Sequence, residues 1–121
     1  MKILLIDDEP DIRRIGAAAL SKLGGFEVLE AHGGEVGIQQ ALRDVPDAIL
    51  LDMMMPGMDG LQTLRAIQAD AVLREIPVAF MTARVQSDEV SQYLDAGARG
   101  VIPKPFNPLT LASTVKEIFG W

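Results

Sequence analysis

Apolar runs of strand length recur along the chain at nearly regular intervals, each bounded by Gly, Pro or Asp. Between these runs, apolar residues are spaced three and four positions apart, which is the period of an amphipathic helix. This alternation predicts a parallel sheet with helices on both faces. The predicted strands are Lys2–Ile6, Phe26–Ala31, Asp47–Leu51, Pro77–Met81 and Arg99–Ile102. The predicted helices are marked by Ile12, Ile15, Ala19 and Leu23, by Ile38, Ala41, Leu42 and Val45, by Leu61, Leu64 and Ile67, by Val90, Tyr93 and Leu94, and by Leu111, Val115 and Ile118.

Residues with strong helix-end preferences stand near the ends of these periodic segments. Pro10 suits a first helical turn, and Asn107 followed by Pro108 predicts an N-cap and first helical residue. Ser87 is a candidate cap for the fourth helix. Gly97 stands where that helix should end in a left-handed conformation.

The five β/α units predict one domain over residues 1–121, since the chain has no linker, repeat or low-complexity segment. The expected fold is α/β, a (βα)5 doubly wound five-stranded parallel sheet in the order 2-1-3-4-5. Crossovers should be right-handed. In such open sheets, ligands bind beyond the carboxyl ends of the strands, near the switch in strand order. The residues that follow each strand are therefore the candidates for function.

Composition narrows the class of function. Lys and Arg number 11 and Asp and Glu number 17, so the net charge is 11 − 17 = −6, which disfavours direct binding to nucleic acid or to anionic membranes. Cysteine is absent, which excludes disulfides and thiolate metal sites. The apolar run at the start is interrupted at once by Asp7-Asp8-Glu9, so we expect no export signal and a cytoplasmic location.

Acidic residues follow two strands that should be neighbours in the sheet. Asp7 and Asp8 follow the first strand, and Asp52 follows the third. Three converging carboxylates repel one another unless a cation is present, and hard oxygen ligands suit Mg²⁺. His32 is the one histidine in the chain, so a zinc or copper centre is not expected.

A hydroxyl and a lysine follow the remaining strands. Thr82, with Ala83 beside it, comes after the fourth strand, and Lys104 comes after the fifth. Taken alone, each of these residues is commonly a turn, cap or surface residue. Together around one crevice, they suggest a phosphate site in which Asp52 attacks as a carboxylate nucleophile, while Lys104 and the metal hold the phosphoryl oxygens.

At this point the chain resembles the receiver domain of two-component response regulators over nearly its whole length. The matching motifs are Leu5-Ile6-Asp7-Asp8-Glu9, Leu50-Leu51-Asp52-Met53-Met54-Met55-Pro56-Gly57-Met58-Asp59-Gly60, Met81-Thr82-Ala83 and Lys104-Pro105-Phe106. The resemblance implies that Asp52 accepts a phosphoryl group from a phosphohistidine on a sensor histidine kinase or phosphotransfer protein. It also implies that Mg²⁺ is held by the residues Asp7, Asp8, Asp52 and the backbone carbonyl of Met54. The phosphate-binding and switch positions would be Thr82, Ala83 and Lys104, and the Lys104–Pro105 bond is typically cis in the family.

The resemblance further implies a partner-binding face over the fourth helix, fifth strand and fifth helix, roughly residues 87–120. A downstream effector protein or domain would bind there, and a homodimer could form on phosphorylation. The chain departs from the family pattern at Val101, where an aromatic residue is usual, and at Pro103. The signal from Thr82 should then travel by backbone or aliphatic repacking. Met54 offers no group to position water, which predicts a long-lived phosphoryl state.

Three other functions fit the chain less well. An aspartyl-nucleophile phosphatase would need a second Asp two positions after Asp52, where Met54 stands. A flavin-binding domain would need a phosphate-cradling loop after the first strand, where three acidic residues stand. The third is a receiver-like module that binds partners without being phosphorylated, against which the complete residue set argues.

Overall fold

The computed structural model describes residues 1–121 and contains one parallel sheet in the order β2-β1-β3-β4-β5. This confirms the predicted doubly wound α/β fold. The strands are β1 (Lys2–Ile6), β2 (Glu27–Ala31), β3 (Ala48–Asp52), β4 (Val78–Thr82) and β5 (Gly100–Pro103). The helices are α1 (Pro10–Lys22), α2 (Gly34–Asp44), α3 (Gly60–Ala69), α4 (Ser87–Asp95) and α5 (Leu111–Phe119), with a short 3-10 helix η1 (Leu73–Glu75) before β4.

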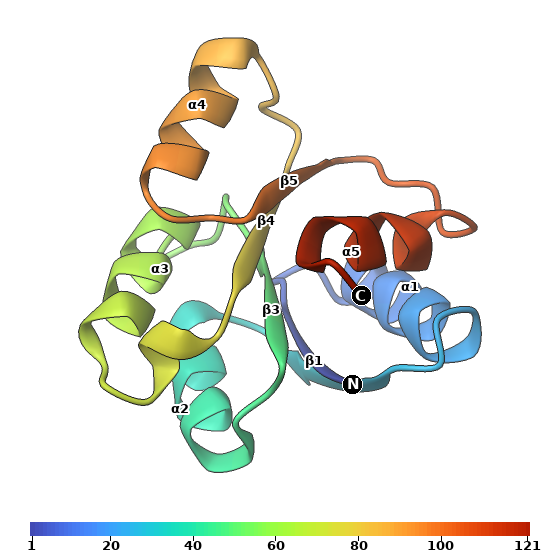
Figure 1. The fold of residues 1–121 in the computed structure, drawn as a ribbon, viewed down its shortest axis with the longest axis horizontal. Helices are drawn as coiled ribbons and strands as arrows, with labels where there is room; N and C mark the ends of the chain where they lie inside the picture. Colours follow the sequence, from blue (N-terminus) through green and yellow to red (C-terminus); the bar gives the residue numbers. More distant parts are fainter.

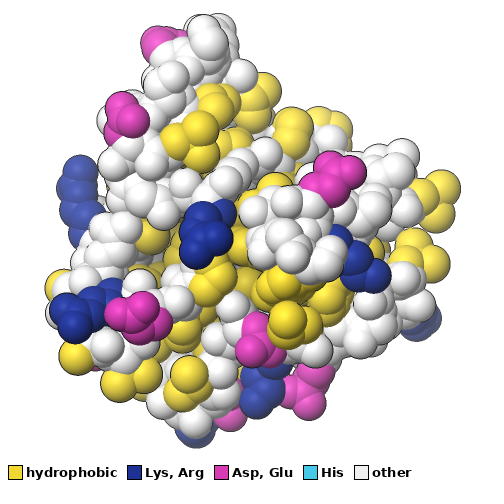
Figure 2. All heavy atoms as spheres, in the orientation of Figure 1, with side chains coloured by type: hydrophobic (Ala, Val, Ile, Leu, Met, Phe, Trp, Pro, Cys, Tyr) yellow, Lys and Arg dark blue, Asp and Glu magenta, His cyan; other side chains and the backbone are white.

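The helices cover both faces of the sheet and create two separate cores. In Figure 1, α1 and α5 lie on one side of the strands, while α2 and α3 lie on the other. The first core joins α1 and α5 to one face of the strands, and the second joins α2, α3 and α4 to the opposite face. None of the helices combines the length and the apolar character needed to cross a membrane. On the face shown in Figure 2, Lys and Arg side chains lie dispersed among acidic ones.

The central strands β3 and β4 are buried along their whole length. Because both of their faces are covered, their sequences are continuous apolar runs rather than alternating ones. The edge strand β2 is exposed at Glu27 and Glu30, as an edge that must avoid pairing with other chains usually is. A polar side chain at the end of β3 or β4 is therefore buried, with little access to water.

Three strands begin and end one residue later than the apolar pattern predicts. Asp52, Thr82 and Pro103 are the last residues of β3, β4 and β5, rather than the residues that follow them. Backbone pairing continues through them, with Asp52 opposite Met81 and Thr82 opposite Pro103. The prediction ended each strand at its last apolar side chain, whereas ladder hydrogen bonds do not depend on side-chain polarity.

The predicted start of α1 and the predicted end of α4 are correct, whereas the predicted N-caps of α4 and α5 are wrong. Pro10 begins α1, and Gly97 adopts φ +113° after α4. Ser87 is the first residue of α4 and caps nothing, because Gln86 is the extended residue before the helix. Asn107 begins a separate turn, accepting the N–H of Leu109 at its Oδ1 (2.9 Å), and α5 starts only at Leu111.

The loop after β3 is fixed by the first residues of α3. Asp59 and Gln62 form a reciprocal capping box, each side chain accepting the other residue's backbone N–H at 2.9 Å. The N–H of Gly60 donates to the carbonyl of Met53 at 2.9 Å. A Cβ at Gly60 would lie 2.7 Å from the Met53 Cα and 2.8 Å from the Asp52 carbonyl oxygen, so only glycine allows this approach.

We therefore expect Gly60→Ala to destabilise the domain by on the order of 1–3 kcal/mol, because backbone atoms on both sides must move. The matched control is Gly33→Ala, since Gly33 precedes α2 in an extended conformation with open space where its Cβ would be. Urea unfolding of both variants measures the difference. Equal stability of the two variants would contradict the close approach at Gly60.

Candidate functional site

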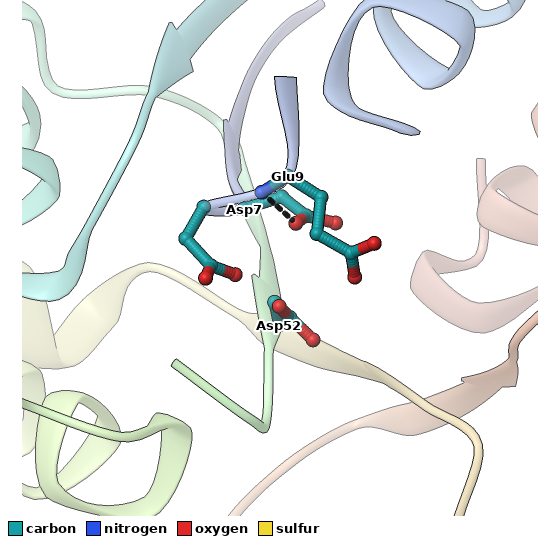
Figure 3. Close-up of side chains that lie close together, drawn as sticks. Asp7, Glu9 and Asp52 are labelled. Carbon is teal, nitrogen blue, oxygen red and sulfur yellow. Dashed lines mark hydrogen bonds between the residues drawn. The ribbon is translucent and has the colours of Figure 1, made fainter. Parts of the chain in front are cut away.

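The carboxyl ends of β1, β3, β4 and β5 bring the predicted site residues to one edge of the sheet. Ile6 pairs with Leu51 and Asp52 pairs with Met81, which places Asp7, Asp52 and Thr82 on adjacent strand ends. Figure 3 shows the side chains of Asp7, Glu9 and Asp52 gathered around one space. One carboxylate oxygen from each of four residues, Asp7, Asp8, Glu9 and Asp52, lies within 4.8 Å of all the others.

Lys104 reaches this cluster from the loop after β5. Its Nζ lies 2.8 Å from Asp7 Oδ2, 3.2 Å from Asp52 Oδ1 and 3.6 Å from Glu9 Oε1. The peptide bond between Lys104 and Pro105 is cis. Lys104 therefore links the loop after β5 to the ends of β1 and β3 through ion pairs with Asp7 and Asp52.

Burial makes the charge on Asp52 costly. Asp7 is 0% exposed and Asp52 is 2% exposed, so neither carboxylate is stabilised by much water. Burial and the neighbouring charge of Asp7 raise the pKa of Asp52 to about 7, although Lys104 opposes the rise. Burial also lowers the pKa of Lys104, but its hydrogen bond to Asp7 and both carboxylate charges outweigh burial and raise it.

Two acceptor oxygens in the cluster have no hydrogen-bond donor. Asp8 Oδ1 and Asp52 Oδ2 are buried and unpartnered, whereas both oxygens of Asp7 accept bonds, from the Glu9 N–H (2.9 Å) and from Lys104. Unpaired buried carboxylate oxygens are strongly unfavourable without a cation. The donor set consists of hard oxygens alone, so these residues fit Mg²⁺.

The remaining predicted site residues surround this cluster. Thr82 is buried, and its Oγ1 accepts the Arg84 N–H at 3.0 Å, which leaves the hydroxyl proton free to be donated. Met54 lies two residues after Asp52 and is 60% exposed. Ala83 lies on the wall of an open cavity that also contains Lys104.

That cavity, of about 480 Å³, opens beside the acidic cluster. Glu9 and Lys104 are the charged residues that line it, and the other lining residues are apolar. The apolar walls come from α1 and from the loop before α5: Ile12, Ile15, Pro105, Phe106 and Pro108. The cavity gives a group outside the protein a path toward Lys104 without crossing the core.

The role of Glu9 was not assigned from the sequence. Its carboxylate belongs to the cluster and faces Lys104, while its backbone N–H donates to Asp7. Glu9 is also the N-cap residue of α1, which starts at Pro10. A signal was available, because a proline at the first helical position makes the preceding residue, here Glu9, the N-cap of the helix.

Comparison of the sequence with protein families matches the response regulator receiver domain over residues 3–116. The chain belongs to this family. Receiver domains are the phosphorylation-dependent signalling switches of two-component systems, and that is the class of function that this chain has. The two alternatives from other families, a phosphatase and a flavin-binding domain, are not favoured.

Individual relatives agree with this assignment. The receiver domain is 36% identical over 117 residues to the phosphate regulon transcriptional regulatory protein PhoB of Klebsiella pneumoniae, covering 97% of this chain and 51% of that protein. It is 35% identical over 119 residues to the chemotaxis protein CheY of Pseudomonas aeruginosa, covering 98% of this chain and 96% of that one. The chain thus spans about half the length of its PhoB relatives and nearly all of its CheY relatives.

Solved structures show the same receiver fold. The chemotaxis response regulator CheY4 of Vibrio cholerae superposes with a TM-score of 0.89 at 29% identity, covering 97% of each chain. A response regulator from Desulfuromonas acetoxidans superposes with a TM-score of 0.86 at 25% identity, covering 98% of this chain and 96% of that one.

The raised pKa of Asp52 leads to a stability prediction for the metal-free receiver domain. The fold favours the neutral form of the Asp52 carboxyl over the charged form. The stability that the neutral carboxyl contributes is therefore fully present below about pH 4 and is lost as pH rises toward 7. Asp52→Asn removes the charge and should stabilise the protein at pH 7 in a chelator, by on the order of 2 kcal/mol and at most about 4. The gain should shrink as pH falls toward 4.

The control for that prediction is Glu117→Gln, which removes one negative charge at an exposed position of α5. Its stability should stay within about 0.5 kcal/mol of the original protein. Chemical unfolding at several pH values measures all three proteins. An Asp52→Asn variant that is no more stable than the original at pH 7 would show that the carboxylate cluster is not under electrostatic strain.

Proposed function

We propose that this receiver domain accepts a phosphoryl group on Asp52 in a Mg²⁺-dependent reaction. The donor is the phosphohistidine of a sensor histidine kinase or phosphotransfer protein. The observation that carries the proposal is the asymmetry of the Asp52 carboxylate. Oδ1 is paired with Lys104, whereas Oδ2 is buried without any donor. Once Asp52 is ionised, a carboxylate oxygen that no donor occupies is a nucleophile that needs no general base.

In the transfer, a carboxylate oxygen of Asp52 forms a bond to phosphorus as the bond from phosphorus to the donor's imidazole nitrogen breaks. The electron pair returns to that nitrogen. The residues Asp7, Asp8, Asp52 and the backbone carbonyl of Met54 would hold Mg²⁺, which when bound neutralises charge on the phosphoryl oxygens. Lys104 balances the same charge from the loop after β5, and Thr82 donates its hydroxyl proton to a phosphoryl oxygen.

The phosphorylated site then changes the surface used by a partner. Thr82 ends β4 and pairs with Pro103 in β5, so a movement of Thr82 toward the phosphoryl group displaces β5 directly. Val101 lies opposite Phe80 in the same ladder, so aliphatic repacking carries the change toward α4. The face over residues 87–120 would bind a downstream effector, or a second copy as a phosphorylation-promoted homodimer.

Several broader features belong to the same proposal. Residues 1–121 form one receiver domain that acts in the cytoplasm and has no direct contact with nucleic acid or membrane. Its own chemistry is limited to phosphoryl transfer onto Asp52 and slow self-dephosphorylation, so it is not a conventional enzyme. A partner-binding module that is never phosphorylated is the alternative, and the full set of acidic, hydroxyl and lysine groups at one edge disfavours it.

Phosphoryl transfer can be tested with a small phosphodonor such as acetyl phosphate. Intact-mass spectrometry should show one added phosphoryl group in the presence of Mg²⁺ and none in the presence of EDTA. Asp52→Asn should abolish labelling, whereas Asp11→Asn, at an exposed position in the first turn of α1, should leave it unchanged. Undiminished labelling of the Asp52→Asn variant would sink the assignment of the acceptor. An original protein that no donor or kinase labels would support the partner-only alternative.

The exposed apolar side chain of Met54 leads to a prediction about the phosphoryl lifetime. It can neither orient nor deprotonate an attacking water, so the aspartyl phosphate should last for minutes or longer. Met54→Asn places a polar group beside the acceptor and should shorten the lifetime several-fold. The decay of the labelled mass after removal of the donor measures both proteins. Loss of the label from the original protein within seconds would count against this role of Met54.

A further inference from the structure

Arg13 lies on α1 behind the acidic cluster and makes two directed contacts. Its Nη1 donates to the backbone carbonyl of Asp7 at 2.9 Å, and its Nε donates to Glu30 Oε1 at 3.2 Å. The side chain of Arg13 is only 16% exposed. The next residue, Arg14, is exposed and makes no ion pair or side-chain hydrogen bond. The two neighbouring arginines therefore have different roles.

The contact with Asp7 replaces a missing backbone hydrogen bond. The N–H of Asp7 continues the ladder between β1 and β2 by donating to the Ala31 carbonyl at 3.0 Å. The carbonyl of Asp7 accepts no backbone N–H, because the chain leaves the ladder there to enter α1. Arg13 satisfies that carbonyl, and Glu30 of β2 anchors Arg13. Strand β2 thus fixes the N–H of Asp7 directly through Ala31, and it fixes the carbonyl of Asp7 indirectly through Glu30 and Arg13.

We propose that Arg13 is a positioning residue for the acidic pair Asp7-Asp8, and that Glu30 holds it in place. The carbonyl that Arg13 binds belongs to the peptide unit joining Asp7 to Asp8. Rotation of that unit would swing the Asp8 carboxylate, whose buried Oδ1 has no donor. The inference rests on the proposed function, because it assumes that Asp8 binds the cation.

The two contacts require arginine. They use two different nitrogens of a planar guanidinium, one facing a carbonyl and the other a carboxylate. A lysine has a single nitrogen and a shape that does not fix both directions at once. The Arg13–Glu30 pair itself should add little to stability, since the Glu30 side chain is 40% exposed. Its effect should therefore appear in cation binding more than in folding.

Mg²⁺ titration of the full chain by isothermal calorimetry tests the proposal with two variants and one matched control. Arg13→Lys keeps the charge and should raise the Mg²⁺ dissociation constant about tenfold, which is the lower end of the usual effect of residues that orient ligands. Glu30→Gln keeps Arg13 and should raise it about threefold, because the guanidinium loses a charged anchor. Arg14→Lys makes the same substitution at the exposed neighbour and should leave the constant unchanged.

A second readout separates positioning from a general loss of stability. Mg²⁺ should raise the thermal unfolding midpoint of the original protein, and this rise should be smaller in Arg13→Lys than in Arg14→Lys at the same Mg²⁺ concentration. Arg13→Lys with an unchanged dissociation constant, or with a lower midpoint but a full Mg²⁺-induced rise, would overturn the positioning role. If the original protein itself binds no Mg²⁺, the proposed function fails instead. Failure of the proposed function is therefore distinguishable from failure of the positioning role of Arg13.

Discussion

Asp7 and Asp52 lie buried side by side at the carboxyl edge of the sheet, and Lys104 is the one cationic side chain within ion-pairing distance of them. Together they carry two negative charges against one positive charge in a site with little water. Burial, reinforced by the negative charge of Asp7, raises the pKa of Asp52, and one of the Asp52 carboxylate oxygens has no hydrogen-bond donor. In the proposed function, a divalent cation or a phosphoryl group on Asp52 alters this balance, and Lys104 and Thr82 respond to the change. Under that proposal, the capacity to switch follows from the unbalanced charge of this cluster.

The fold brings these charges together and also prevents them from moving apart. Helices on both faces bury β3 completely, so Asp52 cannot turn toward water without leaving its strand. The loops around the cluster are in turn fixed by local bonds, through the Asp59–Gln62 capping box on one side and Arg13 on the other. A rigid frame therefore surrounds the charged groups, and strain at the site does not simply relax through loop movement.

The sequence was sufficient for the fold and for the proximity of the acidic and basic residues, because both follow from periodicity and from the rule that parallel strands end at one edge. Strand ends, helix caps and contacts between side chains on different elements could not all be predicted from the sequence. Strand ends were misplaced by one residue at Asp52 and Thr82, since pairing runs through polar residues. The cap at Ser87 was wrong because the chain is already helical there. The contact of Arg13 with Glu30 joins residues on different elements, and no local pattern indicates it.

The central claim is that the phosphoryl group resides on Asp52, and chemical trapping tests it most directly. Borohydride reduces an aspartyl phosphate to homoserine, so the protein would be phosphorylated in Mg²⁺, reduced, digested and sequenced by tandem mass spectrometry. The account predicts homoserine at position 52 and at no other aspartate, with none in a sample prepared without donor. Homoserine at Asp7, Asp8 or Asp59, or a phosphoryl group recovered on His32 with none trapped at Asp52, would contradict it.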